Sequence, residues 1–253
     1  MNDPHVEALY YKVNHGQHVD YTKAVPFNRE EKDFSIQIAD KRVQITMKTH
    51  FPSLADARAA VEPFLRAWEL DIGLRYGPRA LEFDYQRGEV IDRKPAPGVG
   101  TVVVEPGNLK LTTFAPKLIN GFATFPAPPG GMARDPTVDA MFNRYVLYRD
   151  GGTTLGDAAN YCLTCLQKDA GGREAAARKF LIAEAVLKEV GRLPATKGGA
   201  EARKADGAAT DFTPAEVQWL ERAMTLIIRR ASEVAFDPPA TRPKITLADL
   251  PRL

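Results

Sequence analysis

The stretch Phe125-Pro126-Ala127-Pro128-Pro129-Gly130-Gly131 divides the sequence into two parts with different periodicity. Its prolines lack N–H donors and its glycines carry no stiffening side chain, so it continues neither a helix nor a central strand. Apolar residues alternate with polar ones before it and recur about every 3.6 residues after it. We therefore expect four segments: a sheet domain over 1–125, a linker over 126–136, a helical domain over 137–236 and an extended, proline-rich tail over 237–253.

A β-hairpin is predicted in the first part. Apolar and polar residues alternate over 34–38 and again over 43–47, and Asp40 and Lys41 lie between them as a tight turn. Shorter patterns of the same kind predict three further strands, at 81–85, 101–105 and 109–114.

One helix is expected to pack on this sheet. Ser53 and Asp56 have the spacing of a capping box, and apolar side chains recur every three or four positions over the following residues 54–70. Pro63 removes one helical hydrogen bond, so we expect a kink or an early break near Glu62. Strands, a helix and further strands in this order predict an α+β fold with an antiparallel sheet and one packed helix.

The second part is expected to form a four-helix bundle. Helical periodicity and capping residues predict its helices over 138–149, 155–168, 173–192 and 214–235. Residues 194–211 are rich in alanine, glycine and charge, and they form a longer loop than compact bundles need.

The composition is that of an ordinary globular protein. The 253 residues include 34 basic and 32 acidic side chains, for a formal net charge of +2. This balance lacks the large positive excess of a dedicated nucleic-acid binder. The sequence contains no run of about eighteen apolar residues and does not start with a signal-peptide pattern. We therefore expect a cytoplasmic protein that does not contact a membrane.

Signals for a metal, a cofactor or a catalytic nucleophile are weak. Cys162 and Cys165 have a C-x-x-C spacing, but no second pair accompanies them, so they are expected on a packed helix face. His5, His15 and His18 are candidate metal ligands, although a mobile terminal loop would not hold them rigidly. The chain has no Gly-x-Ser-x-Gly elbow and no glycine-rich phosphate loop. We expect no metal and no cofactor.

The leading hypothesis is a non-enzymatic binding or regulatory protein that acts through its helical domain. Trp219 and Ile228 lie off the apolar stripe of the last predicted helix and widen its apolar arc beyond what one core requires. Aromatic residues are frequent anchors of protein interfaces. These two side chains are therefore predicted to face a protein partner or a second copy of the chain.

Nucleic-acid or nucleotide binding is the first alternative. The basic residues Lys197, Arg203 and Lys204 of the long loop are its candidate contacts, although acidic neighbours dilute their field.

The order of a β-rich part and a four-helix bundle resembles proteins that end in a bundle of the higher-eukaryote and prokaryote nucleotide-binding (HEPN) type. Ribonucleases of that family carry an arginine followed a few residues later by a histidine. No histidine follows His50 here, so the resemblance is to a form without that catalytic pair.

An enzyme of unrecognised type is the second alternative. Asp84, Glu89 and Asp92 are acidic residues on or near one predicted strand, and carboxylates that converge can act as general acids and bases. The sequence leaves open whether they meet.

Overall fold

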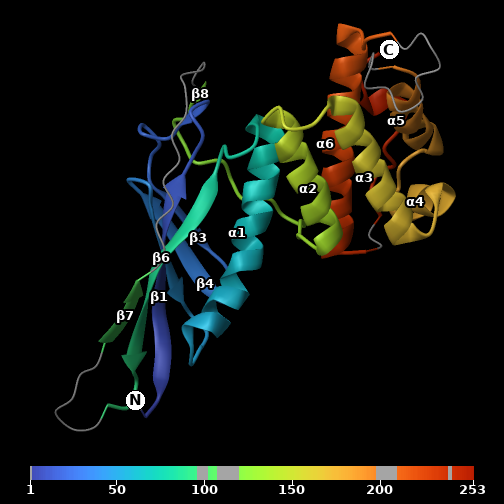
Figure 1. Cartoon of the computed structure of the whole chain (residues 1–253). Helices are drawn as coiled ribbons and strands as arrows, with labels where there is room; N and C mark the ends of the chain where they lie inside the picture. The colour runs from blue at the N-terminus through green and yellow to red at the C-terminus, as the bar shows by residue number, and fades with distance from the viewer. Residues whose placement is uncertain (1, 96–101, 107–119, 198–209, 239–240) are drawn as a thin grey trace. The chain divides into compact units, whose positions relative to one another are not determined.

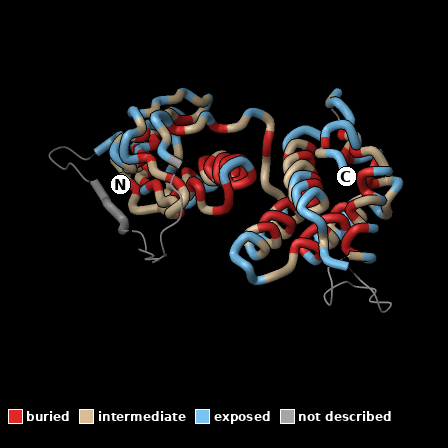
Figure 2. Tube along the Cα trace, turned by 90° about the horizontal axis from the view of Figure 1, so that it is seen from above, coloured by how far each residue is buried: buried red, intermediate tan, exposed pale blue. Residues whose placement is uncertain are grey.

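The chain folds into two compact units, Met1–Pro129 and Gly130–Leu253. The computed structural model describes residues 2–95, 102–106, 120–197, 210–238 and 241–253, with only the backbone given for 102–106 and Asn120. Buried positions, red in Figure 2, occur in both units. The predicted α+β class is confirmed: an antiparallel sheet and a helix form the first unit, and helices form the second.

Six antiparallel strands form the main sheet of the first unit, in the order β3-β4-β5-β1-β6-β7 (Figure 1). A separate parallel pair joins β2 to β8. The strand bounds are β1 Pro4–Asn14, β2 Val19–Asp20, β3 Phe27–Glu30, β4 Phe34–Ala39, β5 Arg42–Met47, β6 Glu82–Asp92, β7 Val102–Pro106 and β8 Asn120–Gly121.

The hairpin of β4 and β5 is confirmed, with Ala39 opposite Arg42 across a two-residue turn. Asp40 and Lys41 both have positive φ angles, 49° and 62°. Such a turn matches the right-handed twist of the flanking strands, and glycine or asparagine is the usual choice for it. The predicted strand at 81–85 is longer than expected, and the one at 109–114 lies outside the described residues.

Strand β1 lies in the middle of the sheet, although the sequence pattern does not predict it. Burial along it does not alternate, because two neighbouring pairs are buried, His5 with Val6 and Ala8 with Leu9. The register with β6 shifts twice, once between Val6 and Ala8 and once between Tyr10 and Tyr11. Bulges of this kind insert an extra residue and interrupt the period of two.

Helix α1, Leu54–Tyr76, covers one face of the sheet (Figure 1). The Ser53 side chain accepts a hydrogen bond from the Asp56 N–H at 3.2 Å and caps its first turn. The expected early break is wrong, since the helix continues through Pro63. Its sheet-facing residues recur every three or four positions and join the core: Ala57, Val61, Leu65, Trp68 and Ile72.

The linker begins as part of the first unit. Phe125 is a buried member of the core, and the Trp68 Nε1–H donates to the Pro126 carbonyl at 3.0 Å. The backbone of the stretch is thereby held against α1, which explains why the division between the units falls after Pro129.

The second unit has five helices among the described residues, where we expected four. The predicted helix over 173–192 is two helices, and residues 180–183 separate them. The bounds are α2 Pro136–Arg149, α3 Leu155–Ala170, α4 Arg173–Lys179, α5 Glu184–Thr196 and α6 Pro214–Phe236, with a short 3-10 helix Leu247–Asp249 in the tail.

A buried arginine explains the break between α4 and α5. The Arg230 guanidinium donates to the carbonyls of Phe180 at 3.1 Å, Leu181 at 3.0 Å and Pro243 at 2.8 Å, and it pairs with Glu233. Carbonyls freed at a helix end need donors, and Arg230 supplies them. Arg230 is only 6% exposed.

The tail packs back onto the helical unit at the same break. The Ala183 N–H donates to the Ile245 carbonyl at 2.7 Å, and the Ile245 N–H donates to the Leu181 carbonyl at 2.9 Å. Leu181, with a φ of 49°, turns the backbone out of the helix to make this pairing. The tail therefore completes the unit.

Candidate binding face of the sheet

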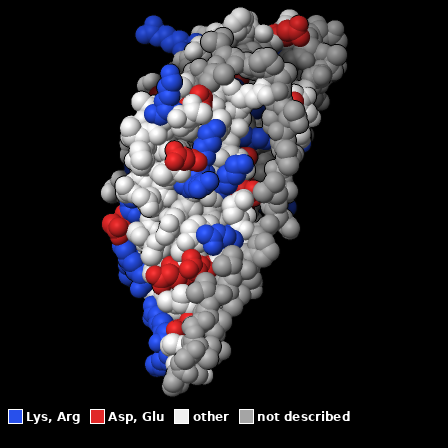
Figure 3. Space-filling view, turned by 90° about the vertical axis from the view of Figure 1, so that its left-hand side faces the viewer, with Lys and Arg blue, Asp and Glu red and all other residues white. Residues whose placement is uncertain are grey.

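The sheet face opposite α1 carries polar and basic side chains. The cross-strand partners Gln37, Gln44, Tyr10 and Arg87 form a row across β4, β5, β1 and β6. No helix among the described residues of this unit covers that face. Figure 3 views the molecule from the left of Figure 1, and Lys and Arg side chains gather near the middle of that side, with Asp or Glu side chains among them. We call this surface the open face.

A depression of about 730 Å³ lies on the open face. Four of the residues around it are basic and only Asp40 is acidic, so its rim has an excess of positive charge. Its lining residues come from β1, β4, β5, β6 and the hairpin turn: Tyr10, Tyr11, Lys12, Gln37, Ala39, Asp40, Lys41, Arg42, Val43, Gln44, Gln86 and Arg87.

Two of the basic side chains stand directly opposite each other. Lys12 on β1 is the register partner of Arg42 on β5, and both are exposed. Like charges at such a position are destabilising, because the Cβ atoms of opposite residues lie only about 5 Å apart. On the other side of Lys12, the Asp84 carboxylate accepts a hydrogen bond from Gln86 at 3.2 Å. Lys12 therefore lies between Arg42, which repels it, and its β6 register partner Asp84, which attracts it.

Arg87 lies on the ring of Tyr10, with 3.9 Å between the guanidinium carbon and the ring centroid. The Tyr10 hydroxyl donates to the Glu89 carboxylate at 3.0 Å and so fixes the ring. Burial, together with this hydrogen bond, raises the pKa of Tyr10 and keeps the hydroxyl protonated. The result is a flat guanidinium held in place by a cation–π contact.

Lys41 reaches the same depression from the turn. Its left-handed conformation disfavours any residue with a Cβ, by roughly 1–2 kcal/mol. The Lys41 carbonyl accepts from the Val13 N–H at 2.8 Å, which ties the turn to β1.

Close ion pairs are absent at the four basic residues of the depression within the described part of the chain, although Asp20 is near enough to Lys41 for the two charges to interact. Lys12, Lys41, Arg42 and Arg87 form no ion pair with a described carboxylate, although many other basic residues of both units do. This concentration of unpaired positive charge makes the open face the candidate binding site.

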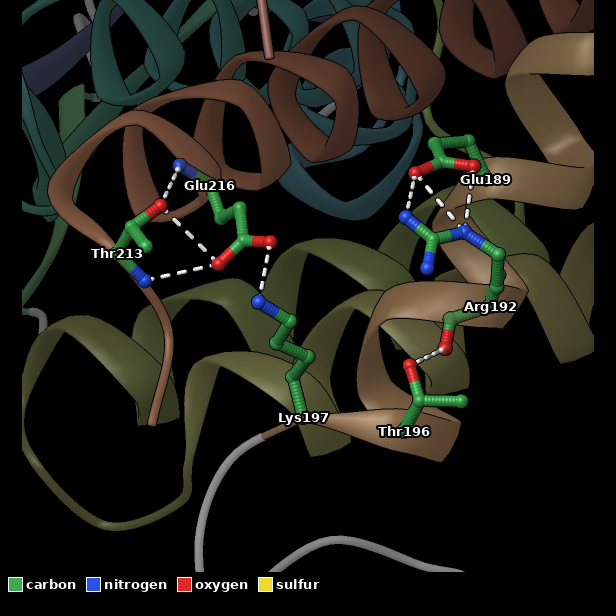
Figure 4. A network of polar contacts seen from close by, with 6 residues as sticks. All are labelled: Glu189, Arg192, Thr196, Lys197, Thr213 and Glu216. Carbon is green, nitrogen blue, oxygen red and sulfur yellow. Dashed lines mark hydrogen bonds and ion pairs between the residues drawn. The ribbon is translucent and has the colours of Figure 1, made fainter. Parts of the chain in front are cut away.

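The loop cluster predicted as an anion contact is not assembled in the described residues. Lys197 ends α5, and its Nζ pairs with the Glu216 carboxylate at 2.9 Å (Figure 4). Glu216 also accepts from the Thr213 N–H at 2.8 Å and caps α6. Lys197 therefore joins two helix ends, whereas Arg203 and Lys204 lie outside the described residues.

Trp219 and Ile228 are not presented on a surface of the folded chain. Trp219 is 1% exposed and Ile228 is fully buried, so the expectation that they face a partner is wrong for this structure. Helix α6 contacts α2, α3 and α5 and buries residues over most of its circumference. A central helix needs a wide apolar arc without any second chain.

The acidic residues of β6 do not converge. Asp84 and Asp92 are eight residues apart on one strand, which corresponds to roughly 25 Å. Asp92 accepts from the backbone N–H groups of Asn2 and Asp3, and these bonds lower its pKa. Glu89 is held by Tyr10. These carboxylates have structural hydrogen-bond partners and do not form one site.

Neither the cysteines nor the histidines form a ligand set. Cys162 is buried, and burial raises the pKa of its thiol, which leaves it protonated and unreactive. His5 stacks on His50 near the start of β1, whereas His15 and His18 follow its end. Within the described ranges no three His, Cys, Asp or Glu side chains are placed to share a metal ion. No described helix is both long and apolar enough to span a bilayer.

Comparison with protein-family models, with curated proteins and with solved structures finds no match to this chain. The resemblance to HEPN bundles thus gains no support from a family model.

Sequence reasoning missed the open face because its residues are far apart in the chain. Tyr10, Lys12, Arg42 and Arg87 lie on three strands, and only the register of β1 with its neighbours brings them together. Lys41 in the hairpin turn and Arg42 directly after it were the one local signal, since they put two basic side chains at the end of a predicted strand pair.

Proposed function

We propose that this chain is a non-enzymatic, cytoplasmic binding protein whose sheet unit takes an anionic ligand on the open face. One observation supports the proposal most: four basic side chains surround one depression without a carboxylate partner among the described residues. Positive groups around a hollow raise the local concentration of anions.

The energetics of the open face favour a ligand over a purely structural role. Lys12 and Arg42 repel each other, and Lys41 has a backbone conformation that glycine would adopt with less strain. Natural proteins keep such unfavourable choices most often where activity requires them. An anion between these side chains would offset the repulsion.

Protein association through the helical unit remains a separate hypothesis. It loses the two side chains that motivated it, since Trp219 and Ile228 are buried in the chain itself. The hypothesis of anion binding at the end of α5 loses support in the same way, because Lys197 already has Glu216 as its partner.

Isothermal titration with inorganic polyphosphate tests the proposal. We expect the wild type to bind and the double variant Lys12→Thr/Arg42→Thr to lose most of the affinity. The matched control, Lys23→Thr/Lys32→Thr, removes the same charge from two exposed lysines outside the depression and should bind like the wild type. Equal weakening in both variants, or no binding by the wild type, would contradict the proposal.

A further inference from the structure

The shape of the open face restricts the class of anion. Six strands at about 4.8 Å spacing make a surface roughly 24 Å wide. A duplex major groove about 12 Å wide admits a helix or a two-stranded ribbon, so this sheet cannot enter it to reach base edges. Bases that are already unpaired, in contrast, can lie directly against these side chains.

The chemistry of the central row suits bases better than a simple polyanion. Gln37 and Gln44 face each other across β4 and β5, and their amides both donate and accept hydrogen bonds. Tyr10 and Arg87 continue the row with an aromatic ring under a flat guanidinium, a surface on which a base can stack. The row spans about 14 Å over its three strand-to-strand steps.

The basic residues flank this row on one side. Lys12 and Arg42 lie two positions farther along their strands than Tyr10 and Gln44, which is about 7 Å. Lys41 follows in the turn. Bases on the central row would therefore have their phosphates beside the repulsive pair, where negative charge stabilises the fold most.

We infer that the anion is a single nucleic-acid strand that crosses β4, β5, β1 and β6, an inference that rests on the proposed function of the open face. Lys12, Arg42 and Lys41 contact its phosphates, Arg87 on Tyr10 stacks with a base, and Gln37 and Gln44 pair with base edges. An acidic peptide or an inorganic polyanion would leave the amides and the Arg87–Tyr10 pair without a role.

Fluorescence anisotropy of a labelled, mixed-sequence twelve-nucleotide RNA strand tests the inference on the full chain. The wild type should bind this strand more than about tenfold more tightly than the same sequence as a duplex. Arg87→Ala should weaken single-strand binding on the order of tenfold while it changes polyphosphate binding much less. Lys12→Thr/Arg42→Thr should reduce the slope of log affinity against log salt by about 1.4, which is about 0.7 for each lost phosphate contact.

The outcomes separate the inference from the proposed function. If polyphosphate and poly-glutamate compete as well as the RNA strand, and Arg87→Ala affects all three equally, the single-strand inference is wrong and anion binding stands. If duplex and single strand bind alike, the inference also fails. If no anion binds, or if binding is unchanged in Lys12→Thr/Arg42→Thr, both proposals fail. Folding of the sheet unit in each variant is checked in a Trp219→Phe background by the fluorescence of Trp68, which is buried in that unit.

Discussion

The helical unit and the open face of the sheet unit use basic residues in opposite ways. In the helical unit, Arg230 is 6% exposed and reaches three backbone carbonyls and Glu233, and Lys197 joins the Glu216 cap. On the open face of the sheet unit, Lys12 and Arg42 lie opposite each other, both side chains are exposed, and their charges repel.

This difference separates structural charge, which is used for contacts within the fold, from available charge, which has no ion-pair partner in the fold and can bind a ligand. A buried guanidinium with its hydrogen bonds satisfied stabilises the fold, and removing it leaves carbonyls and a carboxylate unpaired. The exposed pair of Lys12 and Arg42 forms no ion pair with a described carboxylate, so an anion that binds between the two side chains should add stability. Substitution of a basic residue should therefore change the free energy of unfolding in opposite directions. Removal of Arg230 should lower it, and removal of a basic side chain on the open face should raise it.

Trp219→Ala should have the largest effect. Removal of a side chain that is 1% exposed leaves a cavity in the helical unit, and we expect a loss of about 3–5 kcal/mol in its free energy of unfolding. Chemical denaturation followed by far-ultraviolet circular dichroism measures this. Sedimentation should show an unchanged oligomeric state. A small loss of stability together with altered association would indicate that Trp219 lies at an interface between chains.

Arg230→Met should destabilise the helical unit by about 3 kcal/mol, because it strands the Glu233 carboxylate and the carbonyls at the break between α4 and α5. Arg222→Met is the matched control on the exposed side of α6 and should change stability by less than about 0.5 kcal/mol. Similar denaturation midpoints for the two variants would show that the buried contacts of Arg230 do not stabilise the helical unit.

Lys41→Gly should stabilise the sheet unit by about 1 kcal/mol, since glycine adopts the left-handed turn without a Cβ clash. It should also weaken polyphosphate binding. Asp40→Gly relieves the same kind of strain in the same turn but keeps Lys41, so it should stabilise without weakening binding. Parallel loss of affinity in both variants would assign the effect to the backbone of the turn.

Lys12→Thr should give the smallest change, a gain of about 0.5 kcal/mol in the sheet unit at low salt, because it removes the repulsion from Arg42. The gain should shrink as salt screens the pair. Thermal denaturation at two ionic strengths measures it. A loss of stability at low salt would mean that attraction between Lys12 and Asp84 outweighs the repulsion.

Local patterns in the sequence predict the elements that obey a single period. The β4–β5 hairpin alternates cleanly and has its turn residues between the strands, so it is found where expected. Helix α6 has its Thr213 cap and begins at Pro214 as predicted. Strand β1 escapes prediction because two register shifts against β6 break its alternation.

Features that depend on distant contacts could not be predicted. The break between α4 and α5 requires Arg230 and the tail around Ile245, which lie about fifty residues or more away in the chain. The burial of Trp219 follows from the helices that surround α6, which one helical pattern cannot show. The open face likewise depends on strand register, since Lys12 and Arg42 are thirty positions apart.

The most direct test of available charge is a thermal denaturation of the sheet unit with and without inorganic polyphosphate. In a Trp219→Phe background, Trp68 is the sole tryptophan and reports this unit alone. Without polyphosphate, Lys12→Thr/Arg42→Thr should melt at a higher temperature than the parent. With saturating polyphosphate the order should reverse, because only the parent gains stability from the anion. The opposite result has two parts: the parent melts at a higher temperature than the double variant without polyphosphate, and polyphosphate leaves the melting temperature of the parent unchanged. This result would show that the charge on the open face is not available to a ligand.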